Sequence, residues 1–175
     1  MISLSTSGQN VAAFLLLVLT TACSDVSTTK SVQHSPNSDE KIELSTLNVY
    51  KSPTCVCCSK WIKHIEKHGF QSKTHNVDNL SAIKEKHGIP VNLRSCHTAI
   101  SKNGFVFEGH VPAKFIQQFL NNPPANALGL SVPSMPLGSP GMEVDDKFMP
   151  YRVILLKSDG QHEIYKEVKT YEEQF

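Results

Sequence analysis

The 175-residue chain has no block of basic residues, because its 17 Lys and Arg are balanced by 16 Asp and Glu, which leaves a formal net charge of +1. Nucleic acid is therefore not an expected partner. The most apolar run, residues 11–22, is too short to cross a bilayer as a helix. A phosphate-cradling glycine loop, a nucleophile elbow and a legible Ser/His/Asp set are also absent. These absences argue against nucleotide-binding and serine-hydrolase functions.

We expect residues 1–22 to be a signal peptide, because their apolar part has the length of a signal-peptide core. The segment ends with Ala22 before Cys23, an arrangement that resembles a bacterial lipobox, in which the cysteine is lipidated and becomes the new N-terminus. Thr20 stands where leucine is usual, and no Lys or Arg precedes Val11. The sequence thus predicts lipidation at Cys23 and a lipid anchor as the membrane attachment, with ordinary secretion as the alternative.

Residues 23–45 are rich in Ser, Thr, Asn and charged side chains, with almost no aromatic residues, and predict a flexible tether. The remaining residues, roughly 130, suit one globular domain. Export predicts a periplasmic location. Thiols there are normally oxidised to disulfides, so a cluster of cysteines calls for a functional explanation. We expect a monomer.

The pattern of apolar residues and turn signals predicts alternating strands and helices. The expected elements are a strand at 46–50, a helix from 55 to 69, a strand at 70–77, a helix from 78 to 88, strands at 98–100 and 105–107, and a helix from 112 to 123. Asp78 is the expected N-cap of the second helix. The order β-α-β-α-β-β-α, with cysteines between the first strand and the first helix, is that of a thioredoxin-like domain, which we assign to residues 46–124 in the α/β class.

A C-terminal extension is predicted for residues 125–175. It begins with a loop rich in Pro, Gly and Met at 128–150 and continues as a β-hairpin built from 151–156 and 163–165. Long loops without regular structure are uncommon inside compact domains and usually have a function. We therefore expect this loop to contribute to the metal site.

Three cysteines, Cys55, Cys57 and Cys58, open the first predicted helix. Thiols at a helix N-terminus have a lowered pKa, which favours the thiolate needed both for disulfide exchange and for binding soft metals. Cys55 and Cys58 form a C-x-x-C pair typical of oxidoreductases, but Cys57 would scramble a mixed disulfide and makes more sense as a ligand. With Cys96, four sulfurs could hold a tetrahedral zinc ion or bridge several copper ions, and purely structural disulfides are a third possibility.

The strand order predicts that Cys96 approaches the three clustered cysteines. His110 precedes the third helix beside the Cys96 segment, and is a candidate ligand, proton partner or helix-entry residue. Met135 and Met142 lie in the predicted loop, where their thioethers would either bind Cu(I) or anchor the loop. Strand alternation would turn His97 away from Cys96, so that it is only a near neighbour.

His64 and His68 are spaced four residues apart on the first predicted helix, a spacing that can hold zinc. They lie among lysines on a polar side, and we interpret them as part of a solvated face.

Six motifs together resemble the CopG-like family of bacterial periplasmic copper-tolerance proteins, a family long catalogued as a domain of unknown function. These motifs are residues 50–58 (YKSPTCVCC), Trp61, 88–90 (GIP), 95–99 (SCHTA), 108–113 (EGHVPA) and 135–143 (MPLGSPGME), and the resemblance spans about residues 47–156. It implies a thioredoxin-like domain whose C-terminal extension completes a copper site. It also implies cycling between Cu(I) and Cu(II) in support of efflux. Val56 departs from the Cys-Gly-Cys-Cys loop of many relatives and puts the backbone geometry of the loop in question.

Carried over by motif, the resemblance makes Cys55, Cys57, Cys58 and Cys96 the sulfur ligands, followed by His110, Met135 and Met142. The resulting hypothesis is a periplasmic, lipid-anchored copper-resistance protein that binds several Cu(I) ions in a cysteine-bridged cluster and serves an efflux system. A copper oxidoreductase and a passive copper chaperone would use identical ligands, so both stay open. The same cysteines would also serve a thiol-disulfide oxidoreductase or a zinc protein, and these two functions stay open as well.

Overall fold

The computed structural model describes residues 46–175, and the expectations for the signal peptide, Cys23 and the tether lie outside the described residues. The described elements, in chain order, are β1 (Thr46–Lys51), α2 (Val56–Lys67), β2 (Gln71–Asn76), α3 (Leu80–Lys86), the 3-10 turn η1 (Val91–Leu93), β3 (His97–Ser101), β4 (Val106–Gly109), α4 (Ala113–Asn121), β5 (Ala127–Val132), β6 (Tyr151–Lys157), β7 (His162–Val168) and the 3-10 turn η2 (Tyr171–Gln174). Within this part of the chain, no helix is long and apolar enough to cross a membrane.

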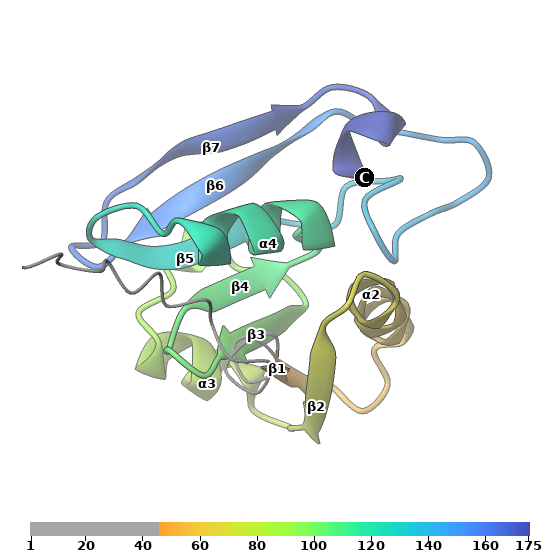
Figure 1. The fold of residues 1–175 in the computed structure, drawn as a ribbon. Helices are drawn as coiled ribbons and strands as arrows, with labels where there is room; N and C mark the ends of the chain where they lie inside the picture. Colours follow the sequence, from red (N-terminus) through yellow and green to blue (C-terminus); the bar gives the residue numbers. More distant parts are fainter. Residues whose placement is uncertain (1–45) are drawn as a thin grey trace, which may run out of the picture. The chain divides into compact units, whose positions relative to one another are not determined.

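All seven described strands form one sheet in the order β2-β1-β3-β4-β5-β6-β7 (Figure 1). The pairs β1/β2 and β4/β5 are parallel, and the other pairs are antiparallel. The mixed α/β class is confirmed, and the element order from β1 to α4 is the β-α-β-α-β-β-α order predicted from the sequence for a thioredoxin-like domain. The sheet continues without a break past residue 124, so that β5 to β7 extend the same sheet.

Strand β5 was not predicted, because it lies inside the stretch interpreted as a loop. The strand contains Gly129, and a bulge interrupts its pairing with β6 between Ala127 and Gly129. A Cβ atom on Gly129 would lie 1.8 Å from the carbonyl oxygen of Val106 on β4, so glycine is required for this close approach. The irregular segment is therefore shorter than expected and runs from residue 133 to 150.

The N-cap of α3 is Asn79 and not the predicted Asp78. The Asn79 Oδ1 atom accepts a hydrogen bond from the Ala82 backbone N–H at 3.1 Å, which satisfies one of the free donors of the first turn. The helix begins one residue later than expected because Asp and Asn are both good caps and sequence alone does not choose between neighbours.

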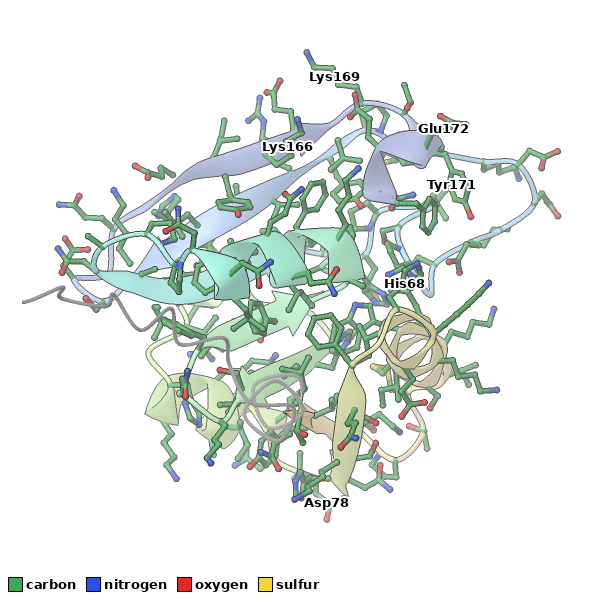
Figure 2. All side chains as sticks on the ribbon, in the orientation of Figure 1. His68, Asp78, Lys166, Lys169, Tyr171 and Glu172 are labelled. Atoms are coloured by element: carbon green, nitrogen blue, oxygen red, sulfur yellow. A yellow bond between two sulfur atoms is a disulfide. The ribbon has the colours of Figure 1, made fainter. Side chains whose placement is uncertain are left out.

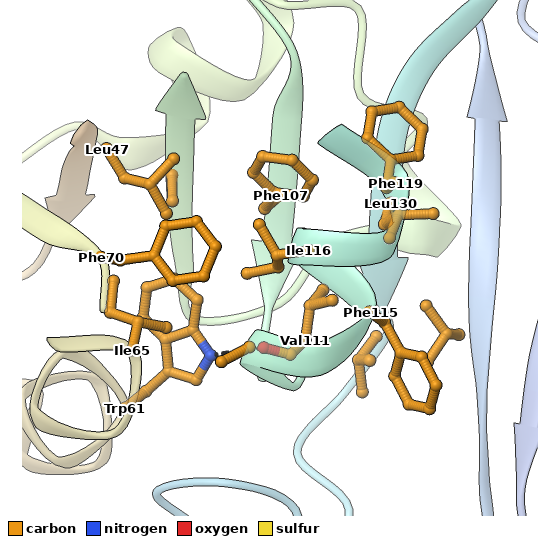
Figure 3. Packing of buried hydrophobic residues seen from close by; sticks show 14 of the residues in the cluster. Leu47, Trp61, Ile65, Phe70, Phe107, Val111, Phe115, Ile116, Phe119 and Leu130 are labelled. Atoms are coloured by element: carbon orange, nitrogen blue, oxygen red, sulfur yellow. Dashed lines mark hydrogen bonds between the residues drawn. The ribbon is translucent and has the colours of Figure 1, made fainter. Parts of the chain in front are cut away.

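The main apolar core lies between the sheet and the helices α2 and α4 (Figure 3). Its largest fully buried side chains include Trp61 from α2, Phe107 from β4, and Phe115 and Phe119 from α4. A smaller cluster lies on the other face and comprises Ile89, Leu93, Val106 and Leu156, with Leu128 and Ile154 packed against it. Neighbours in one strand, such as Val106 and Phe107, belong to different clusters because strand side chains alternate between faces.

The sheet has two free edges, β2 and β7, and both carry charged or polar side chains. Figure 2 shows Lys166 and Lys169 at and just beyond the β7 edge. Charged side chains at an edge discourage pairing with the strand of another molecule.

Candidate metal centre

The cysteine loop stands where β1 gives way to α2, as predicted. Cys55 is the N-cap of α2, and its Sγ atom accepts a hydrogen bond from the Cys58 backbone N–H at 3.3 Å. Val56 is the first residue of the helix and is 70% exposed, and it has no left-handed backbone conformation. The valine therefore fits at this position without backbone strain.

Cys55 and Cys58 form a disulfide, with their Cα atoms 5.4 Å apart. Cys57 and Cys96 are free thiols and are half-buried. The Cys57 Sγ atom lies 3.6 Å from Cys55 Sγ and 4.0 Å from Cys96 Sγ. The four sulfurs all lie within 4.8 Å of one another, which is close enough for a shared metal cluster once the disulfide is reduced.

Cys96 is brought to the loop by the segment before β3, as the strand order predicted. Its backbone carbonyl oxygen lies 3.6 Å from the Cys58 sulfur, and the pairing of β3 with β1 fixes the approach. Burial and the neighbouring Cys57 thiol raise the pKa of Cys96 to about 12. The metal-free thiol is therefore protonated near neutral pH, and binding a metal must release that proton.

His110 points one ring nitrogen at this sulfur. Its Nε2 atom lies 3.1 Å from Cys96 Sγ, and its Nδ1 atom lies 2.7 Å from the Pro140 carbonyl oxygen. A carbonyl only accepts, so Nδ1 carries the proton and Nε2 presents its lone pair to the sulfur. Burial lowers the pKa of His110, which also favours the neutral ring. Of the roles left open for His110, the geometry suits both a ligand and a proton partner.

His97 lies closer to the cluster than the sequence indicated. Its Nδ1 atom is 3.4 Å from Cys96 Sγ, and its ring packs on Trp61 with the centroids 4.3 Å apart. The alternation argument was wrong because Cys96 precedes β3, which begins at His97. The ring is fully buried, and its Nε2 atom has no hydrogen-bond partner among the described residues.

The segment 133–142 covers this site from the C-terminal half of the chain. The Pro140 carbonyl binds His110, and a Cβ atom on Gly141 would lie 2.7 Å from the Trp61 backbone nitrogen and 2.8 Å from the Cys57 carbonyl oxygen. Gly141 therefore packs directly against the start of α2 and has a positive φ of 88°. Only glycine combines that backbone conformation with so close an approach.

A buried polar network holds the Cys96 segment from the other face of the sheet. The Glu108 carboxylate accepts hydrogen bonds from the Ser95 backbone N–H at 2.6 Å and from the Thr98 hydroxyl at 2.7 Å, and it forms an ion pair with Lys84. Burial lowers the pKa of Lys84 and raises that of Glu108, while their mutual attraction opposes both shifts. Sequence reasoning missed this network, although a Glu and a Thr inside apolar strands were a possible signal.

The structure relates the two methionines to the cysteine cluster only through their neighbours in the chain. Met142 follows Gly141 and is half-buried, while Met135 is 48% exposed. The Ser134 carbonyl, next to Met135, accepts a hydrogen bond from the Ser95 hydroxyl. The loop thus brings the backbone beside both methionines to the cluster, and their role as ligands stays a prediction.

The interpretation of His64 as part of a solvated face is not what the structure shows. The His64 Nε2 atom accepts a hydrogen bond from the Ala113 backbone N–H at 3.1 Å, at the start of α4. Burial and the nearby His68 and Lys67 lower the pKa of His64 to about 4. The His68 Nδ1 atom donates to the His64 carbonyl oxygen at 2.8 Å within the same helix, so it is His64 that links α2 to α4.

The fold and the cluster define an α/β protein with a cysteine-rich loop at a helix N-terminus and a donor set suited to soft metals. The chain matches the family model "Protein of unknown function, DUF411" over residues 93–142. It is also similar to two solved structures. The structure of copper resistance protein CopG, form 1, has 38% identity, with 73% of this chain and 100% of that chain covered and a TM-score of 0.68. For form 2 the identity is 39%, the coverage 71% and 98%, and the TM-score 0.67. No curated protein matches.

The chain therefore belongs to the CopG family of copper resistance proteins. The resemblance drawn from the sequence motifs is confirmed. Membership of this family, together with the cysteine cluster, supports a copper-related role.

Proposed function

We propose that this protein binds copper as its cargo in the periplasm, holding Cu(I) between the sulfurs of Cys55, Cys57, Cys58 and Cys96. The observation that carries the proposal is the meeting of four sulfurs within 4.8 Å at a helix N-terminus, with the His110 lone pair turned toward one of them. Thiolates are soft ligands that prefer Cu(I), and four of them with adjacent Cys57 and Cys58 suit several bridged ions better than one.

The protein also interconverts Cu(I) and Cu(II) in support of efflux. The Cys55–Cys58 pair supplies the electrons, because the same loop accommodates the disulfide. Two Cu(II) ions each accept one electron, the two thiols form one S–S bond, and two protons leave to solvent. The reverse reaction reduces the disulfide while two Cu(I) ions are oxidised. Cys57, Cys96 and His110 keep their donor atoms in both states.

Lipid anchoring at Cys23, a monomeric state, and Met135 and Met142 as additional ligands belong to the same proposal. A passive copper chaperone would use the same ligands without the electron step. The reversible change of the disulfide during copper oxidation or reduction separates the two functions.

The test is anaerobic loading of the reduced protein with Cu(I), followed by removal of unbound metal and counting of bound copper. We expect more than one ion per chain, and loss of most of it when Cys55, Cys57 and Cys58 are replaced by Ser together. His162→Gln, at an exposed position on β7, is the control and should leave the count unchanged. Full loading of the triple Ser variant would overturn the site.

The thiol-disulfide oxidoreductase alternative has its own assay. Metal-free reduced protein would then reduce insulin disulfides catalytically, at a rate that depends on Cys55 and Cys58 but not on Cys57. We expect no catalytic turnover, because the Cys57 sulfur lies 3.6 Å from Cys55 and would capture the mixed disulfide.

A further inference from the structure

The 3-10 turn η2 contacts both the loop 133–150 and the helix α2. Tyr171 of this turn packs against Phe148 of the loop, with ring centroids 6.4 Å apart, and Figure 2 shows Tyr171 beside this part of the chain. The ring of Phe175, which directly follows the turn, lies 6.0 Å from that of His64 and 6.1 Å from that of His68 on α2. The turn therefore connects the loop with the helix that carries the cysteines.

The side chain of Gln174 lies at the centre of this contact and is only 1% exposed. Its Oε1 atom accepts a hydrogen bond from the Tyr151 hydroxyl at 2.6 Å. Its Nε2 atom donates to the carbonyl oxygens of Gly138 at 3.0 Å and of Tyr171 at 3.1 Å. Burial raises the pKa of Tyr151, so its hydroxyl remains a donor, and a carbonyl only accepts, which fixes the orientation of the amide. One buried side chain thus joins β6, η2 and the loop.

The loop residue that Gln174 holds is close to a contact that shapes the copper site. Gly138 precedes Pro140 by two residues, and the Pro140 carbonyl accepts the hydrogen bond from His110 Nδ1 at 2.7 Å. Pro140 lies inside a tight turn, which the Gly138 N–H closes by donating to the Met142 carbonyl oxygen at 3.0 Å. A displacement of Gly138 therefore moves the turn and with it the group that orients the His110 ring.

We propose that Gln174 is a positioning residue for the copper site. Through Gly138 it holds the segment 133–142 in place, so that Pro140 fixes the ring of His110. Gln174 acts through the backbone of the segment and not as a ligand. An apolar side chain could fill the same space, but only a side chain with a donor binds the Gly138 carbonyl and gives the segment one orientation. The attachment of the segment is independent of the proposed function, whereas its effect on copper rests on that function.

The test replaces Gln174 by methionine, which has a similar length and no N–H or O–H group. In metal-free Gln174→Met protein, we expect hydrogen–deuterium exchange of the Gly138 and Met142 amides to become about tenfold faster, because one buried hydrogen bond is lost. In reduced, Cu(I)-loaded protein, the number of bound ions should stay the same, since every sulfur is still present. Transfer of Cu(I) to an excess of a chromogenic chelator should become about tenfold faster, as expected when a group that orients a ligand is disturbed.

Tyr151→Phe is the matched control, because it removes the other side-chain partner of Gln174 and leaves the bond to Gly138. This variant loses a buried hydrogen bond without detaching the loop. Its Gly138 exchange and Cu(I) transfer should therefore stay close to those of the wild type, whereas its free energy of unfolding should fall as in Gln174→Met. Equal acceleration in the two variants would assign the effect to stability alone and would refute the proposal.

Circular dichroism reports whether Gln174→Met has folded. If it has not, protection against exchange in the wild-type protein decides the question. A Met142 amide less protected than the Gln174 side-chain amide would show that the segment opens while Gln174 stays bound, which contradicts the proposal. Equal or greater protection of Met142 supports it.

Two further outcomes separate this proposal from the proposed function. Wild-type protein that binds no Cu(I), together with accelerated Gly138 exchange in Gln174→Met, would refute the proposed function and leave the attachment of the segment standing. Wild-type protein that binds Cu(I), together with unchanged Cu(I) transfer from a folded Gln174→Met protein, would instead remove the positioning role of Gln174.

Discussion

Two groups of buried polar side chains lie on opposite faces of β3, and they differ in how fully their atoms are hydrogen-bonded. On the α3 face, the Glu108 carboxylate bonds Lys84, Thr98 and the Ser95 backbone. On the α2 face, Cys96 and His97 face each other, and the His97 Nε2 atom has no partner among the described residues. The neighbouring residues His97 and Thr98 therefore serve different groups.

The difference indicates different roles. A buried charge is tolerated when it is paired and hydrogen-bonded, and Lys84 and Glu108 are paired with each other and both bond the Thr98 hydroxyl. The sulfurs and imidazoles of the opposite face are not fully hydrogen-bonded, and a metal ion can bind to them. We infer that the first group stabilises the fold and positions Cys96, and that the second group binds ligand. The following predictions are ordered by the expected change in the free energy of unfolding.

Breaking the hydrogen-bonded Lys84–Glu108 network should have the largest effect on the free energy of unfolding. Glu108→Gln leaves the Lys84 charge buried without its partner and should lower the free energy of unfolding by about 3–5 kcal/mol, measured by urea denaturation. The double variant Lys84→Met with Glu108→Gln should lose less than Glu108→Gln alone, because no charge remains buried. Equal losses in the two proteins would show that the charge is solvated in the folded state.

Gly141→Ala should disturb the contact between the loop and the cysteine helix. The added Cβ would lie 2.7 Å from the Trp61 nitrogen, which forces a shift costing about 1–3 kcal/mol and moves Pro140 from His110. Gly160→Ala is the matched control, since it has a similar positive φ of 82° but no atom within 4 Å of the added Cβ. We expect about 1 kcal/mol from backbone strain there and unchanged copper binding. Equal effects on copper binding would show that the loop does not shape the site.

Acidification should weaken the packing of α2 against α4. The pKa of His64 is about 4 in the folded protein against 6.5 ordinarily, so the unfolded chain binds more protons between these values. Stability from His64 is therefore present above pH 6.5 and is lost as the pH falls toward 4, by a contribution on the order of 1 kcal/mol after solvent screening. His64→Gln should reduce the slope of stability against pH, while His162→Gln should not. Buried His97 and His110 keep part of the slope in both variants, since burial lowers their pKa as well.

Changing the unsatisfied group should affect stability least. Cys57→Ser alters a half-buried thiol without a structural hydrogen bond to the backbone, and we expect a change below about 1 kcal/mol in metal-free protein. The same variant should lose most of its bound Cu(I), counted as above. A large loss of stability without metal would show that the two faces of β3 do not divide structure from binding.

The sequence predicted the elements that depend on local signals. Helix α2 follows from the spacing of Cys58, Trp61, Ile62 and Ile65, all of which are buried, and the approach of Cys96 to the cysteine loop follows from strand order. Strand β5 was missed because Gly129 was interpreted as a loop residue. Its role is to let β4 approach closely, and this contact between distant residues cannot be deduced from the local sequence.

The clustering of the cysteines could be predicted from the sequence, but the position of the His97 ring could not. Cysteine clustering is a local signal, whereas the value of His97 depends on β3 beginning one residue after Cys96, and element boundaries are the least certain part of a sequence prediction. The partners Lys84 and Glu108 are distant in sequence and come from different elements, so that no spacing rule links them.

Gly141 and Pro140 come after every cysteine of the cluster in the order of synthesis. During translation the four sulfurs and both imidazoles thus leave the ribosome before the segment that packs over them. The hydrogen bond from His110 to Pro140 and the contact of Gly141 with α2 can therefore form only after the rest of the site has been synthesised.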